Sequence, residues 1–208
     1  MEETIRIAVG GVALDGRVAV PAQASTGVVI CHPHPSYGGS MENAVIVTLA
    51  HALQAAGLAT LRFDFRGVGA SGGTHDDGRG EVDDVRAAAA TLRARLDVPR
   101  VSLVGYSFGS VMALRAGCDE PQGVTRIVAI APPVSMIGLE FLAGCHVPLA
   151  FIVGDRDQFC PLATLESMRE RFAPASRVAL IPGADHFFGG HLDALAARVV
   201  DQVRASAN

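Results

Sequence analysis

The fold is decided by the stretch Arg100-Val-Ser-Leu-Val-Gly-Tyr-Ser-Phe-Gly-Ser-Val-Met-Ala-Leu-Arg115. It begins with the apolar run Val101-Ser-Leu-Val104, which is typical of a strand, and ends in the apolar spacing of a helix face. Between them lies Gly105-Tyr-Ser-Phe-Gly109, a Gly-x-Ser-x-Gly pattern at a strand-to-helix junction. In this context the pattern predicts a nucleophile elbow, in which the turn strains the backbone of Ser107 and the glycines let strand and helix approach closely. We therefore expect the Ser107 hydroxyl to project from one end of a sheet.

Length and composition fit one α/β domain that spans residues 1–208 and has a sizeable core. Of these residues, 50% are hydrophobic and 18% are charged. The net charge of −4 gives no electrostatic attraction to nucleic acid or to an anionic membrane. The sequence contains no lysine, so all 17 basic residues are arginine. This excludes Schiff-base chemistry on a lysine and the phosphate-binding loop that needs one.

The cysteines show neither a C-x-x-C pair nor the spacing of a zinc site. They are Cys31, Cys118, Cys145 and Cys160. The N-terminal residues are acidic and form no apolar signal segment, and no apolar run reaches the roughly 18 residues that a membrane span needs. We therefore expect four reduced thiols in a cytoplasmic protein that has no membrane partner. The sequence gives no indication of the oligomeric state.

Alternating apolar residues at the N-terminus predict an antiparallel edge of the sheet. The alternation runs over residues 5–9, is interrupted by Gly10-Gly11 and resumes over residues 12–20. Within the second run, Asp15-Gly16 is a strong hairpin signal, so we expect a hairpin turn there.

The rest of the chain alternates between strand-like and helix-like segments. Strands are predicted over residues 28–31, 58–63, 101–104, 124–130, 148–153 and 177–181. Helices are predicted from Ser40 or Asn43 to about Ala56, over residues 81–96, after the elbow, from 161 to about 172 and from 192 to about 203. Residues 32–40 are rich in proline and glycine and are expected to form neither. This order predicts a mostly parallel sheet with helices on both faces and ligand sites at the carboxyl ends of the strands.

A serine hydroxyl needs a base to activate it and a carboxylate to orient that base. His186, in the loop after the last strand, is the candidate base, and a surface histidine in a flexible loop is the alternative interpretation. Asp155 and Asp157 both follow the strand over 148–153. We choose Asp157 because it reaches further toward the base, whereas Asp155 is able to bond its own turn. Asp185 is adjacent to the base in sequence and so too close to orient it.

The reaction also needs N–H donors for the oxyanion that forms. We expect one from the backbone of Phe108 and one from the loop after the strand over 28–31. Pro33 and Pro35 have no N–H, so His34 is the best second donor. The alternatives to it are Ser36 and Tyr37.

Two further patterns resemble a cofactor site and a metal site, but each lacks a feature that such a site requires. Gly67-Val-Gly-Ala-Ser-Gly72 formally matches the dinucleotide fingerprint G-x-G-x-x-G. That fingerprint requires its third glycine to open a helix, and here the chain stays irregular until about Glu81. The pair His32-x-His34 suggests a metal site but lacks a third ligand nearby. We expect neither a cofactor nor a metal.

Together these features resemble the α/β-hydrolase superfamily over nearly the whole chain. The resemblance is carried by Gly105-Tyr-Ser-Phe-Gly109, by Asp64-Phe-Arg-Gly-Val-Gly-Ala-Ser-Gly72, and by Gly154-Asp-Arg-Asp157 followed by His186. The order Ser107, Asp157, His186 along the chain is the order of this superfamily. Within it, Cys31-His-Pro-His-Pro with Gly38-Gly-Ser-Met-Glu-Asn43 resembles small bacterial hydrolases related to the dienelactone hydrolases.

Three features depart from the patterns of related groups. Dienelactone hydrolases carry a cysteine where this chain has Ser107, and the difference points to cleavage of esters or thioesters. Pro33 replaces the usual glycine of the oxyanion loop. Only about fifteen residues separate the strands over 124–130 and 148–153, too few for the cap that lipases insert there. The resemblance therefore implies a lidless α/β hydrolase with an open site.

The residues and the resemblance predict a serine hydrolase that acts on a small-molecule ester. A thioesterase or a C–C hydrolase would use the same three side chains. A non-catalytic binding protein of the same fold is the alternative from another class, although such a protein is expected to have lost at least one of the three. Apolar residues that suit either an acyl site or the core are Leu139, Phe141, Leu142, Phe159, Phe187 and Phe188.

Overall fold

The computed structural model describes residues 1–96, 98, 100–121, 123–169, 172 and 176–205. These residues build an eight-stranded sheet with the spatial order β1-β2-β4-β3-β5-β6-β7-β8. The strands are β1 (Glu3–Val9), β2 (Val12–Ala19), β3 (Gly27–Cys31), β4 (Ala59–Phe63), β5 (Val101–Tyr106), β6 (Val124–Ile130), β7 (Leu149–Gly154) and β8 (Arg177–Ile181). β2 is antiparallel to both of its neighbours, and the strands from β4 to β8 in the spatial order are parallel. The predicted mostly parallel sheet with an antiparallel N-terminal edge is confirmed.

The turn between β1 and β2 lies at Gly10-Gly11 and not at Asp15-Gly16. Both glycines have positive φ, 50° and 83°, as a two-residue hairpin turn requires. Gly16 lies inside β2, where it pairs with Ile5 on one side and Phe63 on the other. The expectation of a hairpin turn at Asp15-Gly16 is therefore wrong, because β2 runs straight through these residues to reach β4.

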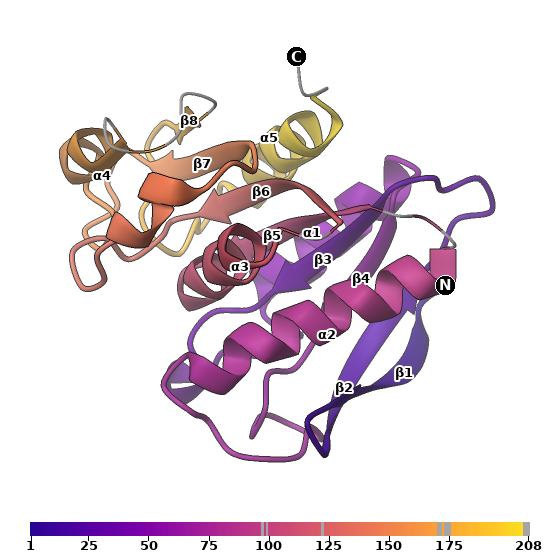
Figure 1. The fold of residues 1–208 in the computed structure, drawn as a ribbon. Coiled ribbons are helices and arrows are strands. Elements are labelled where there is room, and N and C mark those ends of the chain that lie inside the picture. The colour runs from indigo at the N-terminus through magenta and orange to yellow at the C-terminus, as the bar shows by residue number, and fades with distance from the viewer. Residues whose placement is uncertain (97, 99, 122, 170–171, 173–175, 206–208) are drawn as a thin grey trace.

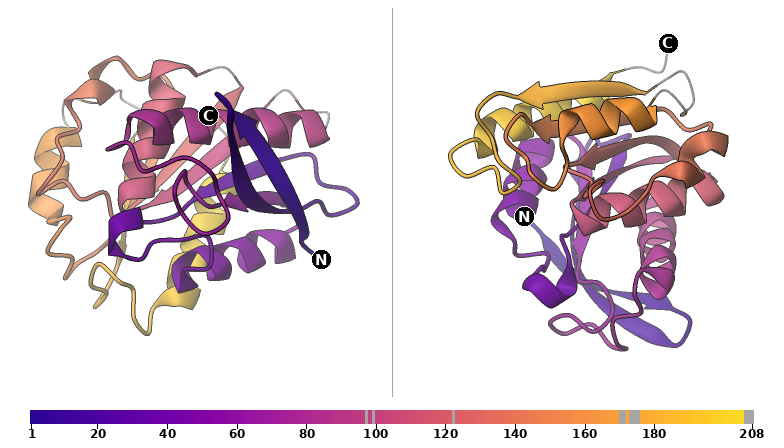
Figure 2. Two further views of the ribbon diagram at one scale, coloured as in Figure 1. Left: turned by 90° about the horizontal axis from the view of Figure 1, so that it is seen from below. Right: turned by 90° about the vertical axis from the view of Figure 1, so that its left-hand side faces the viewer.

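Helices cover both faces of the sheet (Figures 1 and 2). They are α1 (Ala44–Ala55), α2 (Arg79–Leu96), α3 (Phe108–Asp119), α4 (Leu162–Arg169) and α5 (Leu192–Arg204), with the short 3-10 helices η1 (Pro35–Tyr37) and η2 (Glu140–Gly144). Val29 and Cys31 of β3 pack in the same apolar cluster as residues of α2 and α3. Val28 and Ile30 pack in the cluster that contains α1 and α5. Among the described residues, no helix is long and apolar enough to cross a bilayer.

Asn43, and not Ser40, caps the N-terminus of α1. Its Oδ1 accepts a hydrogen bond of 3.0 Å from the N–H of Val45, which satisfies one of the free donors of the first turn. Gly57 follows the helix with φ of 80°, a conformation that glycine adopts without strain and that ends helices.

α2 begins at Arg79, two residues before the predicted start at Glu81. Glu81 is fully buried, and its carboxylate accepts the N–H groups of Asp76 at 2.8 Å and Gly78 at 2.9 Å. These contacts fix the loop that leads into the helix. Gly72 therefore does not open a helix, and the geometry that the dinucleotide fingerprint requires is not formed.

The loop over residues 32–40 contains η1, which the sequence-based interpretation excludes. The side chain of His34 caps it, because Nδ1 accepts the N–H of Ser36 at 3.1 Å. Gly38 N–H closes the turn on the carbonyl oxygen of Pro35 at 3.0 Å. Proline excludes a longer helix, but at the first position of so short a helix it loses no hydrogen bond.

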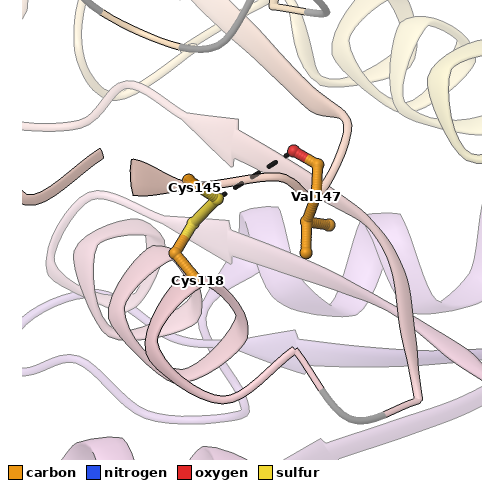
Figure 3. The surroundings of a disulfide bond; sticks show 3 residues. All are labelled: Cys118, Cys145 and Val147. Carbon is orange, nitrogen blue, oxygen red and sulfur yellow. Dashed lines mark hydrogen bonds between the residues drawn. A yellow bond between two sulfur atoms is a disulfide. The ribbon is translucent and has the colours of Figure 1, made fainter. Parts of the chain in front are cut away.

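Cys118 and Cys145 form a disulfide that joins the end of α3 to the segment after η2 (Figure 3). Their Cα atoms lie 4.8 Å apart, although the two residues are 27 positions apart in the chain. The sulfur of Cys145 also lies 4.0 Å from the carbonyl oxygen of Val147. Cys31 and Cys160 are free and buried. The expectation of four reduced thiols is therefore wrong for one pair, since pairing depends on a proximity that only the fold creates.

Candidate active site

The residues over 105–109 form a tight turn between β5 and α3. Ser107 has φ of 55° and ψ of −119°, a strained conformation for a residue with a side chain. Its N–H bonds the carbonyl oxygen of Ile130 in β6 at 2.9 Å. A Cβ on Gly105 would lie 2.2 Å from the oxygen of Gly109, and one on Gly109 would lie 2.4 Å from the oxygen of Cys31. Both glycines are thus required for the close contact of β5, α3 and β3.

The loop after β8 brings His186 to this turn. Its Nε2 lies 3.0 Å from Oγ of Ser107. The imidazole is buried, with 7% of the residue exposed, so the alternative of a flexible surface histidine does not fit. The hydroxyl of Tyr106 donates to the carbonyl oxygen of His186 at 2.9 Å. The residue before the serine therefore holds the backbone of the histidine.

Asp157, in the loop after β7, lies on the other side of the imidazole. Its Oδ2 is 2.9 Å from Nδ1 of His186. Its Oδ1 accepts the N–H groups of Phe159 at 2.8 Å and Cys160 at 2.9 Å, so both oxygens of this buried carboxylate are hydrogen-bonded. An ionised Asp157 only accepts, so Nδ1 carries the proton and Nε2 is left to accept the hydroxyl proton of Ser107.

Asp155 and Asp185, the other two aspartates considered from the sequence, bond backbone N–H groups. Oδ1 of Asp155 accepts the N–H of Gly183 at 2.7 Å. Oδ1 of Asp185 accepts the N–H of Phe187 at 3.0 Å. Each fixes a turn near the site, and within the described residues Asp157 is the carboxylate that contacts the imidazole of His186.

The rings of His34 and Phe108 are neighbours, with centroids 4.7 Å apart, and Phe108 follows Ser107 directly in the chain. The N–H of Phe108 is the first of α3 and so has no partner within the helix, and among the described residues the N–H of His34 donates to no backbone carbonyl. The two alternative donors are already engaged, because Tyr37 N–H bonds the oxygen of His34 at 3.1 Å and Ser36 N–H bonds the His34 ring. Of the candidate donors, the backbone N–H groups of His34 and Phe108 are thus the two that these contacts leave without an acceptor.

His32 supports this loop in a way that the sequence does not indicate. It is fully buried, its Nε2 accepts the N–H of Phe65 at 3.0 Å, and its Nδ1 donates to the oxygen of Pro33 at 2.6 Å. Burial lowers the pKa of His32 to about 4, so the ring is neutral near pH 7. Both nitrogens are used, and His32 is unable to bind a metal together with His34 unless it loses one of these bonds.

Residues 131–148, all of which the structure describes, connect β6 to β7 and contain η2 as their regular element. A cap domain of its own secondary structure does not fit into this connection. The predicted lidless architecture is confirmed.

Comparisons with known proteins agree with this architecture. The alpha/beta hydrolase fold family matches residues 28–146. An alpha-beta serine hydrolase homologue from Coxiella burnetii is 33% identical, with a TM-score of 0.87 over 95% of each chain. A lidless serine hydrolase from Xanthomonas campestris is 28% identical, with a TM-score of 0.86 over 99% of this chain and 96% of that one.

A dienelactone hydrolase from Anabaena variabilis is 25% identical, with a TM-score of 0.84 over 97% of this chain and 96% of that one. The predicted relation to lidless serine hydrolases and dienelactone hydrolases is thereby confirmed. The family match covers more than half of the sequence, residues 28–146 of 208, and includes the strained turn at Ser107. The chain belongs to the alpha/beta hydrolase fold family.

Proposed function

We propose that the protein cleaves small esters through an acyl-enzyme on Ser107, with His186 as general base and acid and Asp157 as the residue that orients it. The observation that supports this most is that the imidazole of His186 contacts both Ser107 and Asp157. Ser107 Oγ lies 3.0 Å from His186 Nε2, and His186 Nδ1 lies 2.9 Å from Asp157 Oδ2. These are the distances that general-base activation of a serine requires.

In the first half of the reaction, Ser107 Oγ attacks the carbonyl carbon of the ester while its proton moves to His186 Nε2. The carbonyl oxygen becomes an oxyanion and accepts the N–H groups of Phe108 and His34. Collapse of this intermediate breaks the bond to the alcohol oxygen, which takes the proton from Nε2. The alcohol leaves, and the acyl group remains on Ser107.

Water completes the cycle. It gives one proton to His186 Nε2 and adds to the acyl carbon, and the oxyanion forms again between the same two donors. Collapse then returns the proton to Ser107 Oγ and releases the carboxylic acid. Throughout both halves Asp157 stabilises the imidazolium that forms.

Labelling with a fluorophosphonate and hydrolysis of p-nitrophenyl acetate test this proposal. We expect wild type to be labelled and to turn over the ester, and Ser107→Ala to lose the label and at least 1,000-fold of kcat (about 10³ or more for such a nucleophile). Ser167→Ala, which removes an exposed hydroxyl on α4, serves as the matched control and keeps both. Turnover that survives in Ser107→Ala would refute the assignment, and absence of label and turnover in wild type would favour a binding protein.

The same three residues would also cleave a thioester. An ester and a thioester of the same acid are therefore compared to identify the substrate class. We expect a butyryl ester to be hydrolysed with a higher kcat/KM than the thioester of the same acid. The reverse order would make the protein a thioesterase that uses the same three residues.

A further inference from the structure

Two phenylalanines border the imidazole of His186. The ring centroid of Phe159 lies 4.8 Å from that of His186 at 62°, and that of Phe187 lies 5.5 Å away at 89°. The other apolar residues that the sequence suggests for an acyl site have different roles. Phe188, Leu139 and Leu142 are fully buried, and Phe141 packs beneath Arg115 with its centroid 5.4 Å from the guanidinium.

Phe187 is exposed, and the fold holds it in that position. The residue has 63% of its surface exposed, which costs free energy in water. Its N–H is bonded to Asp185 Oδ1, and the backbone of His186 before it is bonded to Tyr106. Phe188 after it is fully buried and has φ of 55°. Fixed on both sides, the Phe187 backbone keeps an apolar ring beside the base of the proposed reaction.

The chemistry of the proposed reaction determines which part of the substrate meets these rings. His186 Nε2 gives its proton to the leaving oxygen, so the alcohol portion must lie against the imidazole. The carbonyl oxygen lies toward the loop of His34, which follows β3. In the sheet β3 is on one side of β5, and β7 and β8 are on the other (Figure 1). The loops of Phe159 and Phe187 follow β7 and β8, so these rings lie on the side of the leaving alcohol.

We propose that Phe159 and Phe187 form the binding site for the alcohol portion of the ester, and that the protein prefers esters of aromatic alcohols. A planar ring is able to pack on both phenylalanines and to cover the exposed face of Phe187, whereas a methyl group covers little of it. This inference rests on the proposed function and adds its substrate class.

Benzyl acetate and methyl acetate test the inference, because they give the same acyl-enzyme and their alcohols have similar acidity. We expect wild type to favour benzyl acetate by about tenfold in kcat/KM, and Phe187→Ala to bring the ratio of the two kcat/KM values to within about twofold of one. Cyclohexylmethyl acetate separates an aromatic preference from one for size, and we expect it to rank between the other two.

The rate of deacylation supplies a readout that a loss of structure would not reproduce. The alcohol has left before water attacks, so Phe187→Ala should slow acylation by benzyl acetate and leave deacylation of the acetyl-enzyme unchanged. Tyr37→Ala is the matched control. Its ring is 82% exposed and lies on the β3 side, 5.1 Å from His34, so the ratio of the two esters should stay at its wild-type value.

Three outcomes would overturn the inference. They are equal rate constants for the two esters in wild type, an equal loss on both in Phe187→Ala, and an altered deacylation rate, which would place Phe187 on the acyl side. In each of these cases the protein still hydrolyses esters, so the proposed function stands. No turnover of either ester by wild type would instead refute the proposed function, and the inference with it.

Discussion

Ser107 adopts a backbone conformation that costs a residue with a Cβ about 1–3 kcal/mol. Its surroundings leave it no means to relax. Its N–H is bonded to Ile130 in β6, and Gly105 and Gly109 hold β5 and α3 too close together for the turn to open. The same strain aims the hydroxyl at Nε2 of His186, 3.0 Å away. The strained turn at Ser107 thus lowers stability, and it also fixes the geometry on which the proposed chemistry depends.

Glycine at position 107 should therefore be more stable than alanine at the same position. Glycine adopts positive φ without strain, although it also loses more entropy on folding. We expect Ser107→Gly to raise the free energy of unfolding by about 1 kcal/mol relative to Ser107→Ala in urea denaturation. The comparison with alanine isolates the backbone, because both variants lack the hydroxyl. A lower stability for the glycine variant would mean that Ser107 is not strained.

His32 should make stability fall in mild acid. Its folded-state pKa of about 4 lies below the ordinary 6.5, so between these pH values the unfolded chain takes up a proton that the folded protein does not. This proton uptake lowers the free energy of unfolding. The loss is negligible above pH 6.5 and reaches about 3 kcal/mol near pH 4. We expect His32→Gln, which keeps a donor and an acceptor, to be less stable at pH 7 and to lose this part of the pH dependence. Equal slopes for both proteins between pH 6.5 and 4 would contradict the assignment.

At the scale of elements, segments bounded by local signals are predictable and segments defined by contacts are not. β6 and β8 have the predicted bounds, because their apolar runs end at prolines or glycines. The start of α2 depends on the buried carboxylate of Glu81, and η1 depends on the ring of His34. The local hydrophobic pattern indicates neither of these contacts.

The candidate site divides in the same way. The sequence indicates Ser107 through its local motif, and His186 and Asp157 through their places after parallel strands, whose carboxyl ends share one edge of the sheet. The support from His32 is not predictable, because its partner, the N–H of Phe65, belongs to a different strand-end loop. The position of the β1–β2 turn is also hard to predict. Gly10-Gly11 and Asp15-Gly16 both suit a hairpin turn, and only the pairing of β2 with β4 selects between them.

The start of α1 provides a test at this scale. Asn43→Ala removes the oxygen that accepts the N–H of Val45 and should lower the free energy of unfolding by about 1 kcal/mol. Ser40→Ala is the control, because Ser40 Oγ accepts the N–H of Glu42 at 3.3 Å, ahead of the helix. We expect its effect in urea denaturation to be less than half as large. A larger effect for Ser40 would move the cap to that residue.

At the scale of the whole molecule, the disulfide connects the helix behind Ser107 to the connection between β6 and β7. It closes a loop of 27 residues, and such a closure stabilises a fold chiefly by restricting the unfolded chain.

Breaking this bond should lower stability without changing the site. We expect Cys118→Ser with Cys145→Ser to lose about 3 kcal/mol of unfolding free energy, and a reductant to lower the melting temperature of wild type but not of the double variant. Cys31→Ser is the comparison for a buried free thiol. Identical melting curves of wild type with and without reductant would show that the bond contributes nothing.

The short connection between β6 and β7 also has a consequence for kinetics. Lipases whose site lies beneath a movable lid are activated when a lipid–water interface opens that lid, and their rates jump where the substrate begins to form micelles. Here residues 131–148 carry only η2 as a regular element, so no such opening step precedes access to Ser107. Hydrolysis of a short-chain triglyceride should rise smoothly and saturate through the critical micelle concentration, with no break at the point where droplets appear.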